Sequence, residues 1–271
     1  MTAPLVSVLL PVHDGERFLR EAVESVLAQT LRSLELVAVD DGSTDGTRAI
    51  LESFRDERLL IVPQPHLGLV AALNRAAREA GGSHLTRMDA DDVSLPDRVA
   101  RQAAFLDAHP RVGLVVSGVT VIDADGRRLR TVVLPPDDAS LRRRLLLRNP
   151  FTHGAVTMRR EAFERAGGYR PGYGANEDYD LWRRLARDWE LAAMPEVLYL
   201  YREHPAAVTQ TDVHDRVRSR ERLRDELWRD PALLRAVGRD SDPVEARALL
   251  REALRRRRLR LAGRLLLPRT R

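Results

Sequence analysis

The sequence predicts an α/β protein with a doubly wound, mostly parallel sheet and a helical C-terminal tail. In the first half of the 271-residue chain, apolar runs of strand length alternate with segments whose apolar residues recur at helical spacing. This order is typical of parallel sheets with helices on both faces. The runs end in polar turns, which is where ligands bind in such sheets. Beyond about residue 205 the chain becomes helical and arginine-rich.

The first half is predicted to contain four strands joined by helices. Strands buried on both faces are continuous apolar runs, and they are expected at 5–11, 34–39, 59–62 and 84–88. The helices are expected at 19–29, 45–54 and 67–80. Ser43, Thr44 or Asp45 can cap the second helix, and Gly81-Gly82 ends the third.

The second half is predicted to continue with mixed elements. Strands are expected at 112–122, 129–134, 152–158, 191–194 and 197–201, the first two as a hairpin around the turn 123–126. Helices are expected from Pro96 to about 108, at 138–147, at 161–166 and from about 176. A glycine-rich loop at 169–174 precedes the last helix.

The composition excludes several kinds of protein. There is no cysteine, so disulfides and thiolate metal sites are excluded. No apolar run reaches the roughly 18 residues that would suggest a membrane-spanning helix. The N-terminus enters a strand without a basic leader or cleavage site, which predicts a cytoplasmic protein.

The basic charge is concentrated in the tail. Residues 212–271 carry 18 arginines against 10 acidic residues, although the net charge of the whole chain is +5. Two helices are predicted there, at 214–237 and 244–267, the second with leucine and alanine along one side. Such a helix either lies peripherally on an anionic membrane, here the inner face, or packs on the body or on a second copy. The tail lacks the aromatic interleaving and modules of nucleic-acid binding.

An acidic triplet follows the fourth predicted strand. Asp89, Asp91 and Asp92 lie within four residues and repel one another. Mg²⁺ and Mn²⁺ take oxygen ligands of this kind and keep positions open for substrate phosphates. The alternative is a solvated acidic turn before a helix started by Pro96.

A second polar cluster follows the second strand. Asp40 and Asp41 end that strand, and His13 follows the neighbouring first strand, so the three should meet at one edge. A carboxylate there can accept a hydrogen bond from a pyrimidine imide or a ribose, and an imidazole can stack on a base. The alternative is a capping cluster, because Asp-Gly-Ser-Thr-Asp is favourable turn chemistry by itself.

Further candidates lie in the second half. Glu177 and Asp178 begin a helix, where the dipole stabilises a carboxylate and where a general base could stand. The glycine of His153-Gly154 would let a ligand approach the backbone closely. His204 ends the body and is either an ordinary histidine or a further metal ligand.

In this order, the segments resemble an inverting family 2 glycosyltransferase with the glycosyltransferase A fold. The matching stretches are 6–15, 25–30, 40–45, 88–92, 172–182 and 201–204, which together span about residues 5–205. No single motif is decisive, but the ordered set is specific. His13-Asp14 departs from the usual Tyr-Asn, and Leu73 stands before Asn74 where arginine is frequent.

The resemblance implies a function. Residues 1–205 would form the catalytic domain, with a nucleotide-binding half (1–110) and an acceptor-binding half (111–205), and 206–271 would be an extension. The enzyme would move one sugar from a UDP- or dTDP-type nucleotide-diphospho-sugar to a glycan or lipid-linked acceptor, using Mn²⁺ or Mg²⁺. The motif and membrane spans of processive synthases are absent from the sequence. A homodimer is compatible with this picture.

The resemblance also implies roles for individual residues. Asp178 would be the catalytic base, and Asp41 would bind the nucleotide base. The metal would lie on Asp91 or Asp92 together with His204. The residues implied in substrate binding are Pro11, His13, Asp40, Asp41, Asp89, Asp91, His153, Gly154 and Glu177.

Two other functions compete with this interpretation. A sugar-1-phosphate nucleotidyltransferase would carry a glycine-rich basic loop after the first strand, whereas residues 12–17 contain one glycine. A non-catalytic nucleotide-sugar-binding module would have lost carboxylates, and all of the expected ones are present.

Overall fold

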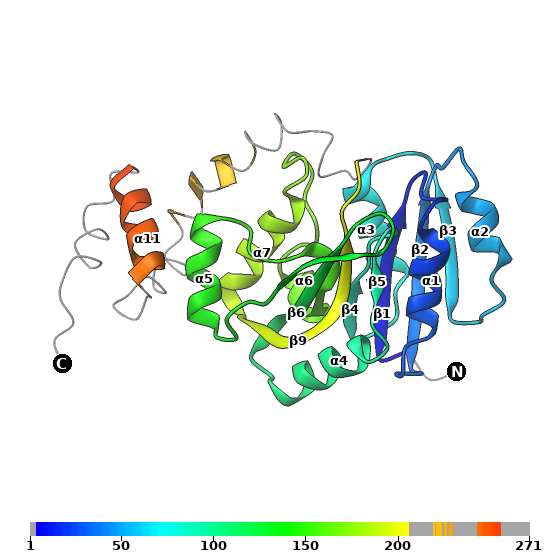
Figure 1. Ribbon diagram of the computed structural model, residues 1–271, viewed down its shortest axis with the longest axis horizontal. Helices are drawn as coiled ribbons and strands as arrows, with labels where there is room; N and C mark the ends of the chain where they lie inside the picture. Colours follow the sequence, from blue (N-terminus) through cyan, green and yellow to red (C-terminus); the bar gives the residue numbers. More distant parts are fainter. Residues whose placement is uncertain are drawn as a thin grey trace.

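The computed structural model describes residues 4–205, residues 243–255 and several positions between 219 and 229. Within this part, one nine-stranded sheet runs through the molecule in the order β3-β2-β1-β4-β8-β6-β9-β5, and β7 pairs with β6 (Figure 1). The strands are β1 (Val6–Val12), β2 (Leu34–Asp41), β3 (Leu59–Gln64), β4 (His84–Arg87), β5 (Val93–Ser94), β6 (Val112–Ile122), β7 (Arg128–Val132), β8 (Val156–Arg159) and β9 (Glu190–Arg202).

The helices lie between the strands as the α/β pattern requires. They are α1 (Leu19–Leu27), α2 (Thr47–Ser53), α3 (Leu69–Glu79), α4 (Arg98–Ala108), α5 (Asp138–Leu147), α6 (Arg160–Arg165), α7 (Glu177–Asp188) and α11 (Pro243–Arg255). Helix α3 packs on β1 and β2, α4 packs on β6 and β8, and α5 and α7 pack on β9. The predicted α/β fold class is therefore confirmed, with helix ends within two residues of the expected ones in most cases. The sheet is mixed rather than mostly parallel, because β4–β8, β5–β9, β6–β7 and β6–β8 pair antiparallel.

The first half forms the parallel part of the sheet. β1 pairs in parallel with both β2 and β4, and β2 pairs in parallel with β3. All seven residues of β1 are buried, as expected for an apolar run covered on both faces. The N-cap of α2 is Gly46 rather than one of the three predicted residues, although Asp45 just before it accepts a hydrogen bond from the Thr47 N–H at 2.9 Å.

The second half differs from the prediction in two places. Residues 152–158 were predicted as one strand, but His153–Ala155 form a 3₁₀ turn and only β8 follows. The two short strands predicted at 191–194 and 197–201 are one strand, β9, whose pairing with β6 is irregular near Gly118. Pro195 lies at that point and has no N–H to donate, so the pairing lapses there without ending the strand.

The described part of the tail packs on the body. Helix α11 contacts α5, and Leu249 and Ala253 are fully buried in the main core. This stretch therefore follows the packing alternative, with Leu254 left 49% exposed. Most of the predicted helix 214–237 and the predicted residues beyond 255 lie outside the described residues. No helix in the described ranges is long and apolar enough to span a bilayer.

Candidate active site

The carboxyl ends of three neighbouring strands bring the candidate residues together. Val12 at the end of β1 is in register with Asp40 on β2. On the other side, Leu9 is in register with Arg87, two residues before Asp89. The antiparallel strand β8 starts at this same edge, so the preceding turn with His153 and Gly154 lies beside the acidic triplet.

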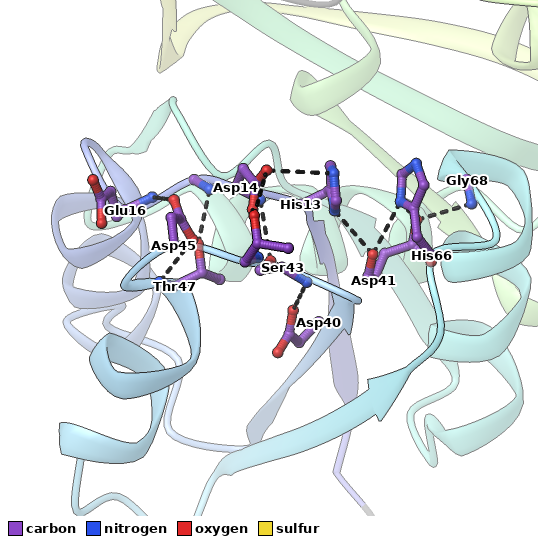
Figure 2. A network of polar contacts seen from close by, with 12 residues as sticks. His13, Asp14, Glu16, Asp40, Asp41, Ser43, Asp45, Thr47, His66 and Gly68 are labelled. Carbon is purple, nitrogen blue, oxygen red and sulfur yellow. Dashed lines mark hydrogen bonds and ion pairs between the residues drawn. The ribbon is translucent and has the colours of Figure 1, made fainter.

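The nucleotide-binding candidates form a polar network at this edge (Figure 2). His13 and His66 stack with their ring centroids 3.9 Å apart, and the Nδ1 atom of each lies within hydrogen-bonding distance of the Asp41 carbonyl oxygen, at 3.0 and 3.1 Å. Both rings are exposed enough to meet a ligand, with side chains 37% and 59% accessible. His66 was not predicted as a site residue.

The Asp41 carboxylate also stabilises the loop that follows β3. Its carboxylate accepts hydrogen bonds from Gln64 Nε2 at 2.6 Å and from the N–H groups of Leu67 at 2.9 Å and Gly68 at 2.8 Å. Burial opposes the charge, but these donors outweigh it and hold the pKa of Asp41 below its ordinary value. Asp41 therefore fixes the loop that carries His66.

Two other predicted nucleotide-binding residues are buried. Asp40 accepts a hydrogen bond from the Ser43 N–H at 3.0 Å, so it does cap the turn. Pro11 lies inside β1 opposite Val39 and is buried in the sheet. Its role in base binding stays a prediction.

The three carboxylates of the acidic triplet point to different partners. Asp89 accepts from Arg87 Nη2 at 2.6 Å, Asp91 Oδ2 lies 2.9 Å from His204 Nε2, and Asp92 accepts from the Arg202 N–H at 2.7 Å. Asp92 is 1% exposed, whereas the side chains of Asp89 and Asp91 are 30% and 32% exposed. Asp92 is thus turned into the protein, which disfavours it as a metal ligand and favours Asp91.

The acidic side chains of this turn lie close together and are partly buried. Burial and repulsion from its acidic neighbours raise the pKa of Asp92 well above its ordinary value. Burial also raises the pKa of Asp89, against the opposing effect of Arg87. Two fully buried arginines, Arg87 and Arg98, lie beneath the turn. Burial lowers the pKa of Arg98 to about 10, and Arg98 Nη2 donates to the carbonyls of Arg87 at 2.7 Å and Gly154 at 2.6 Å.

The residues of this turn could supply part of the coordination of a divalent cation, with the substrate supplying the rest. Asp91 and His204 converge, and a cation bound there would offset the repulsion among the three neighbouring carboxylates. Among the described residues no group of three or more acidic or histidine side chains forms a complete metal cage. Phosphate oxygens of a bound nucleotide would have to supply the remaining ligands, as is usual for Mg²⁺ sites.

Gly154 is explained by crowding within the protein. A Cβ atom there would overlap the Tyr199 hydroxyl and lie 2.7 Å from Asp89 Oδ2. The Asp89 N–H donates to the same hydroxyl at 3.2 Å. The predicted close approach at Gly154 is therefore occupied by Tyr199 and Asp89, which the glycine allows to meet.

Glu177 and Asp178 differ in their surroundings although they are neighbours. Asp178 accepts hydrogen bonds from Asn149 Nδ2 at 2.7 Å and from the Tyr179 N–H at 2.6 Å. Burial raises its pKa to about 6, and these donors limit the rise. Burial and the charge of Asp178 raise the pKa of Glu177 to about 8. Burial therefore raises the pKa of both carboxyl groups, and the donors from Asn149 and the Tyr179 N–H favour the charged form of Asp178.

His153 lies beside this pair. Its Nε2 atom is 2.8 Å from the Tyr169 hydroxyl, and its Nδ1 atom is 3.6 Å from Glu177 Oε1. Burial, together with the charge of Arg87, holds the pKa of His153 well below its ordinary value, so the ring is neutral. Asn74 holds the Tyr169 backbone with two hydrogen bonds, at 2.9 and 3.0 Å.

The structure adds site residues that the sequence analysis missed. They are His66, Arg87, Arg98, Asn149, Tyr169 and Tyr199. A signal existed for Arg87, because a charged residue inside a buried strand next to three aspartates needs a partner. The other five come from separate loops, a strand and the start of α4, and only the folded arrangement brings them to the site.

The fold and the site together define a glycosyltransferase of the glycosyltransferase A fold. TarS of S. aureus in complex with UDP-GlcNAc superposes with a TM-score of 0.64 at 19% identity, covering 93% of this chain and 72% of that one. The mannosyltransferase PcManGT from Pyrobaculum calidifontis, in complex with GDP-Man and Mn²⁺, gives 0.61 at 21% identity, covering 98% and 86%. At these sequence identities, the two similarities establish the fold alone.

The chain belongs to glycosyl transferase family 2, whose model matches residues 7–167. It is 34% identical to EpsE of Bacillus subtilis over 210 residues, which cover 74% of each chain. It is 33% identical to the amylovoran biosynthesis glycosyltransferase AmsE of Erwinia amylovora over 201 residues, covering 72% of this chain and 74% of the relative. The expectation of a glycosyltransferase is thereby confirmed.

Proposed function

We propose that this enzyme transfers one sugar from a nucleotide-diphospho-sugar to an acceptor hydroxyl with inversion, in the assembly of a polysaccharide or cell-surface glycan. The name of AmsE supports the biosynthetic context. Solved neighbours with UDP-GlcNAc and with GDP-Man and Mn²⁺ support a nucleotide-sugar donor and a divalent cation. A UDP- or dTDP-type donor is the form expected from the sequence.

The observation that carries the proposal is the pair of hydrogen bonds that Asp178 accepts, from Asn149 Nδ2 at 2.7 Å and from the Tyr179 N–H at 2.6 Å. A general base must be ionised near neutral pH and must have a pKa close to the working pH. Asp178, with a pKa of about 6, meets both conditions, and Asn149 stabilises its charged form. It takes the proton from the acceptor hydroxyl as that oxygen attacks the face of the sugar opposite the leaving group. One displacement inverts the anomeric centre.

The donor binds at the other end of the site in this scheme. The exposed rings of His13 and His66, which stack on each other, would contact the base, and Asp91 and His204 would hold the cation. When bound, a divalent cation stabilises the negative charge that develops on the leaving diphosphate. Asp89 binds the ribose or diphosphate side of the donor. Residues 1–110 then supply the donor half and residues 111–205 the acceptor half.

The proposal is tested by thermal unfolding in the presence of nucleoside diphosphates with and without Mn²⁺. A ligand that binds the folded state raises the midpoint by mass action. UDP or dTDP is expected to raise the midpoint of the parent only with Mn²⁺, and Asp91→Asn should abolish the increase. Asp188→Asn changes an exposed carboxylate at the end of α7, away from the triplet, and serves as the control. An undiminished shift in Asp91→Asn would reject the metal site.

Peripheral membrane contact and a homodimer stay predictions. The buried face of α11 packs within the chain, so this face is not free to contact a membrane. Co-sedimentation of the full chain with vesicles of increasing anionic lipid content tests it, and absent or salt-insensitive binding would reject it.

A further inference from the structure

The loop that precedes α7 is rich in glycines, which lose much conformational entropy when they become ordered. Gly167, Gly168, Gly172 and Gly174 have φ angles of +78°, +67°, +89° and +53°. Glycine loses more conformational freedom on folding than any other residue. At the end of this loop, Asn176 is the N-cap of α7 but makes no capping hydrogen bond with its side chain. Contacts from elsewhere are therefore needed to fix the loop and the first turn of α7.

The C-terminal tail supplies those contacts. Asn176 Nδ2 donates a 2.8 Å hydrogen bond to Ser219 Oγ, and both residues are buried. Arg222 Nη2 donates to the Gly172 carbonyl at 3.1 Å, and its guanidinium lies 4.5 Å from the centroid of the Tyr173 ring. Asn176 immediately precedes Glu177 and lies two residues before Asp178.

The same stretch of tail is anchored to the body at other points. Glu226 Oε2 lies 2.9 Å from Arg183 Nη2, on the second turn of α7. Trp228 is 1% exposed and its Nε1 donates to the Leu146 carbonyl at 2.8 Å. Leu223 is fully buried in the main core. The segment that contacts the loop is thus itself anchored to the body through Leu223, Glu226 and Trp228.

We infer that the described positions between 219 and 228 hold the catalytic base in place, with Ser219 and Arg222 as positioning residues for Asp178. Neither touches the reacting atoms in this scheme. They fix the loop 172–176 from outside, and the loop sets the position of the first turn of α7. The family model ends at residue 167, so both the loop and the tail segment lie beyond the matched region.

The inference rests on the proposed role of Asp178 and predicts a specific kinetic pattern. Misplacing a reacting group by about 1 Å can reduce the rate about 100-fold. Loosening the loop should therefore lower kcat while leaving the donor site unchanged, since His13, His66 and Asp91 lie on other elements.

The experiment uses the full chain and the donor found by the thermal-shift screen, and it measures release of nucleoside diphosphate and donor affinity. Ser219→Ala and Arg222→Ala are each expected to lower kcat about 10- to 100-fold, with donor affinity unchanged. Ser219→Thr keeps the hydroxyl and should restore the rate. Arg229→Ala removes an exposed arginine from the same segment and serves as the control.

Three outcomes overturn the inference. These are parental kcat in both alanine variants, parallel loss of donor affinity and thermal stability, and no rescue by Ser219→Thr. Asp178→Asn, assayed alongside, separates the two proposals. If Asp178→Asn is inactive while the tail variants are fully active, only the inference fails. If Asp178→Asn keeps its activity, the proposed base itself is wrong.

Discussion

Asn149 Nδ2 donates a 2.7 Å hydrogen bond to Asp178 Oδ2, across 29 residues of sequence. Asn149 follows α5, and Asp178 lies in the first turn of α7. An amide N–H favours the charged form of a carboxylate, so this contact opposes the effect of burial on the pKa of Asp178.

The contact predicts a change in the pH dependence of transfer. The base must be ionised, so the rate should rise with pH through the pKa of Asp178, about 6. Asn149→Ala removes the donor, which raises this pKa and moves the acidic limb of the kcat profile to higher pH. Asn149→Asp is not a suitable control because it adds charge, whereas Thr152→Ala is a neutral change in the same loop. An acidic limb that stays near pH 6 in Asn149→Ala would contradict the assignment.

Glu177→Gln is expected to change how stability depends on pH. Burial raises the pKa of Glu177 from 4.5 to about 8, so the folded state binds this proton more tightly than the unfolded state does. Its stabilising contribution is present below pH 4.5 and is lost as pH rises towards 8. Glutamine cannot ionise, so the variant should gain stability relative to the parent between those values, by about 2–4 °C in midpoint for each kcal/mol.

Thermal unfolding of both proteins at pH 5 and pH 8.5 checks this sign. The difference in midpoint, variant minus parent, should be larger at pH 8.5. A difference that is constant or that falls with pH would mean that Glu177 is ionised in the folded protein throughout.

Gly154→Ala should damage the site through overpacking. The added methyl group overlaps the Tyr199 hydroxyl and approaches Asp89 Oδ2 to 2.7 Å. We expect a loss of about 1–3 kcal/mol in the free energy of unfolding and weaker donor binding, because Asp89 must move. Gly81→Ala is the matched control, since its nearest neighbours would lie at 3.6 Å. Equal stability and donor affinity in the two variants would contradict this account.

Two leucines of α11 test whether the tail belongs to the body. Leu249 is fully buried, whereas Leu254 is 49% exposed. Leu249→Ala should lower the free energy of unfolding by about 2–5 kcal/mol, and Leu254→Ala should change it by less than about 0.5 kcal/mol. Denaturant unfolding of the full chain measures both. Equal small effects would show that α11 does not pack on α5 in solution.

The sequence was most informative where local pattern decides structure. The apolar runs located β1, β2 and β6, because a strand buried on both faces must be continuously apolar. The order of the motifs indicated the family. It also predicted that His13, Asp41 and Asp89 lie at one edge of the sheet. Pattern failed at β9, where a proline inside a paired strand imitates a strand end, and at His153, where a 3₁₀ turn is as apolar as a strand.

The directions in which individual side chains point could not be predicted from the sequence. Asp91 and Asp92 are adjacent and chemically identical, yet one faces His204 and the other the buried backbone of Arg202. The donors that separate the pKa values of Glu177 and Asp178 depend on packing between distant segments, as does the contact between Ser219 and Asn176. No local spacing encodes such contacts.

The most direct test of the account is the release of nucleoside diphosphate by Asp178→Asn under conditions of saturating donor and Mn²⁺. The account predicts that donor affinity equals that of the parent and that the rate falls about 10²- to 10⁴-fold, the usual contribution of a general base. Glu177→Gln should lose much less, because Glu177 is not the group that accepts the proton in this scheme. A parental rate in Asp178→Asn, with the large loss in Glu177→Gln instead, would contradict the assignment of the base.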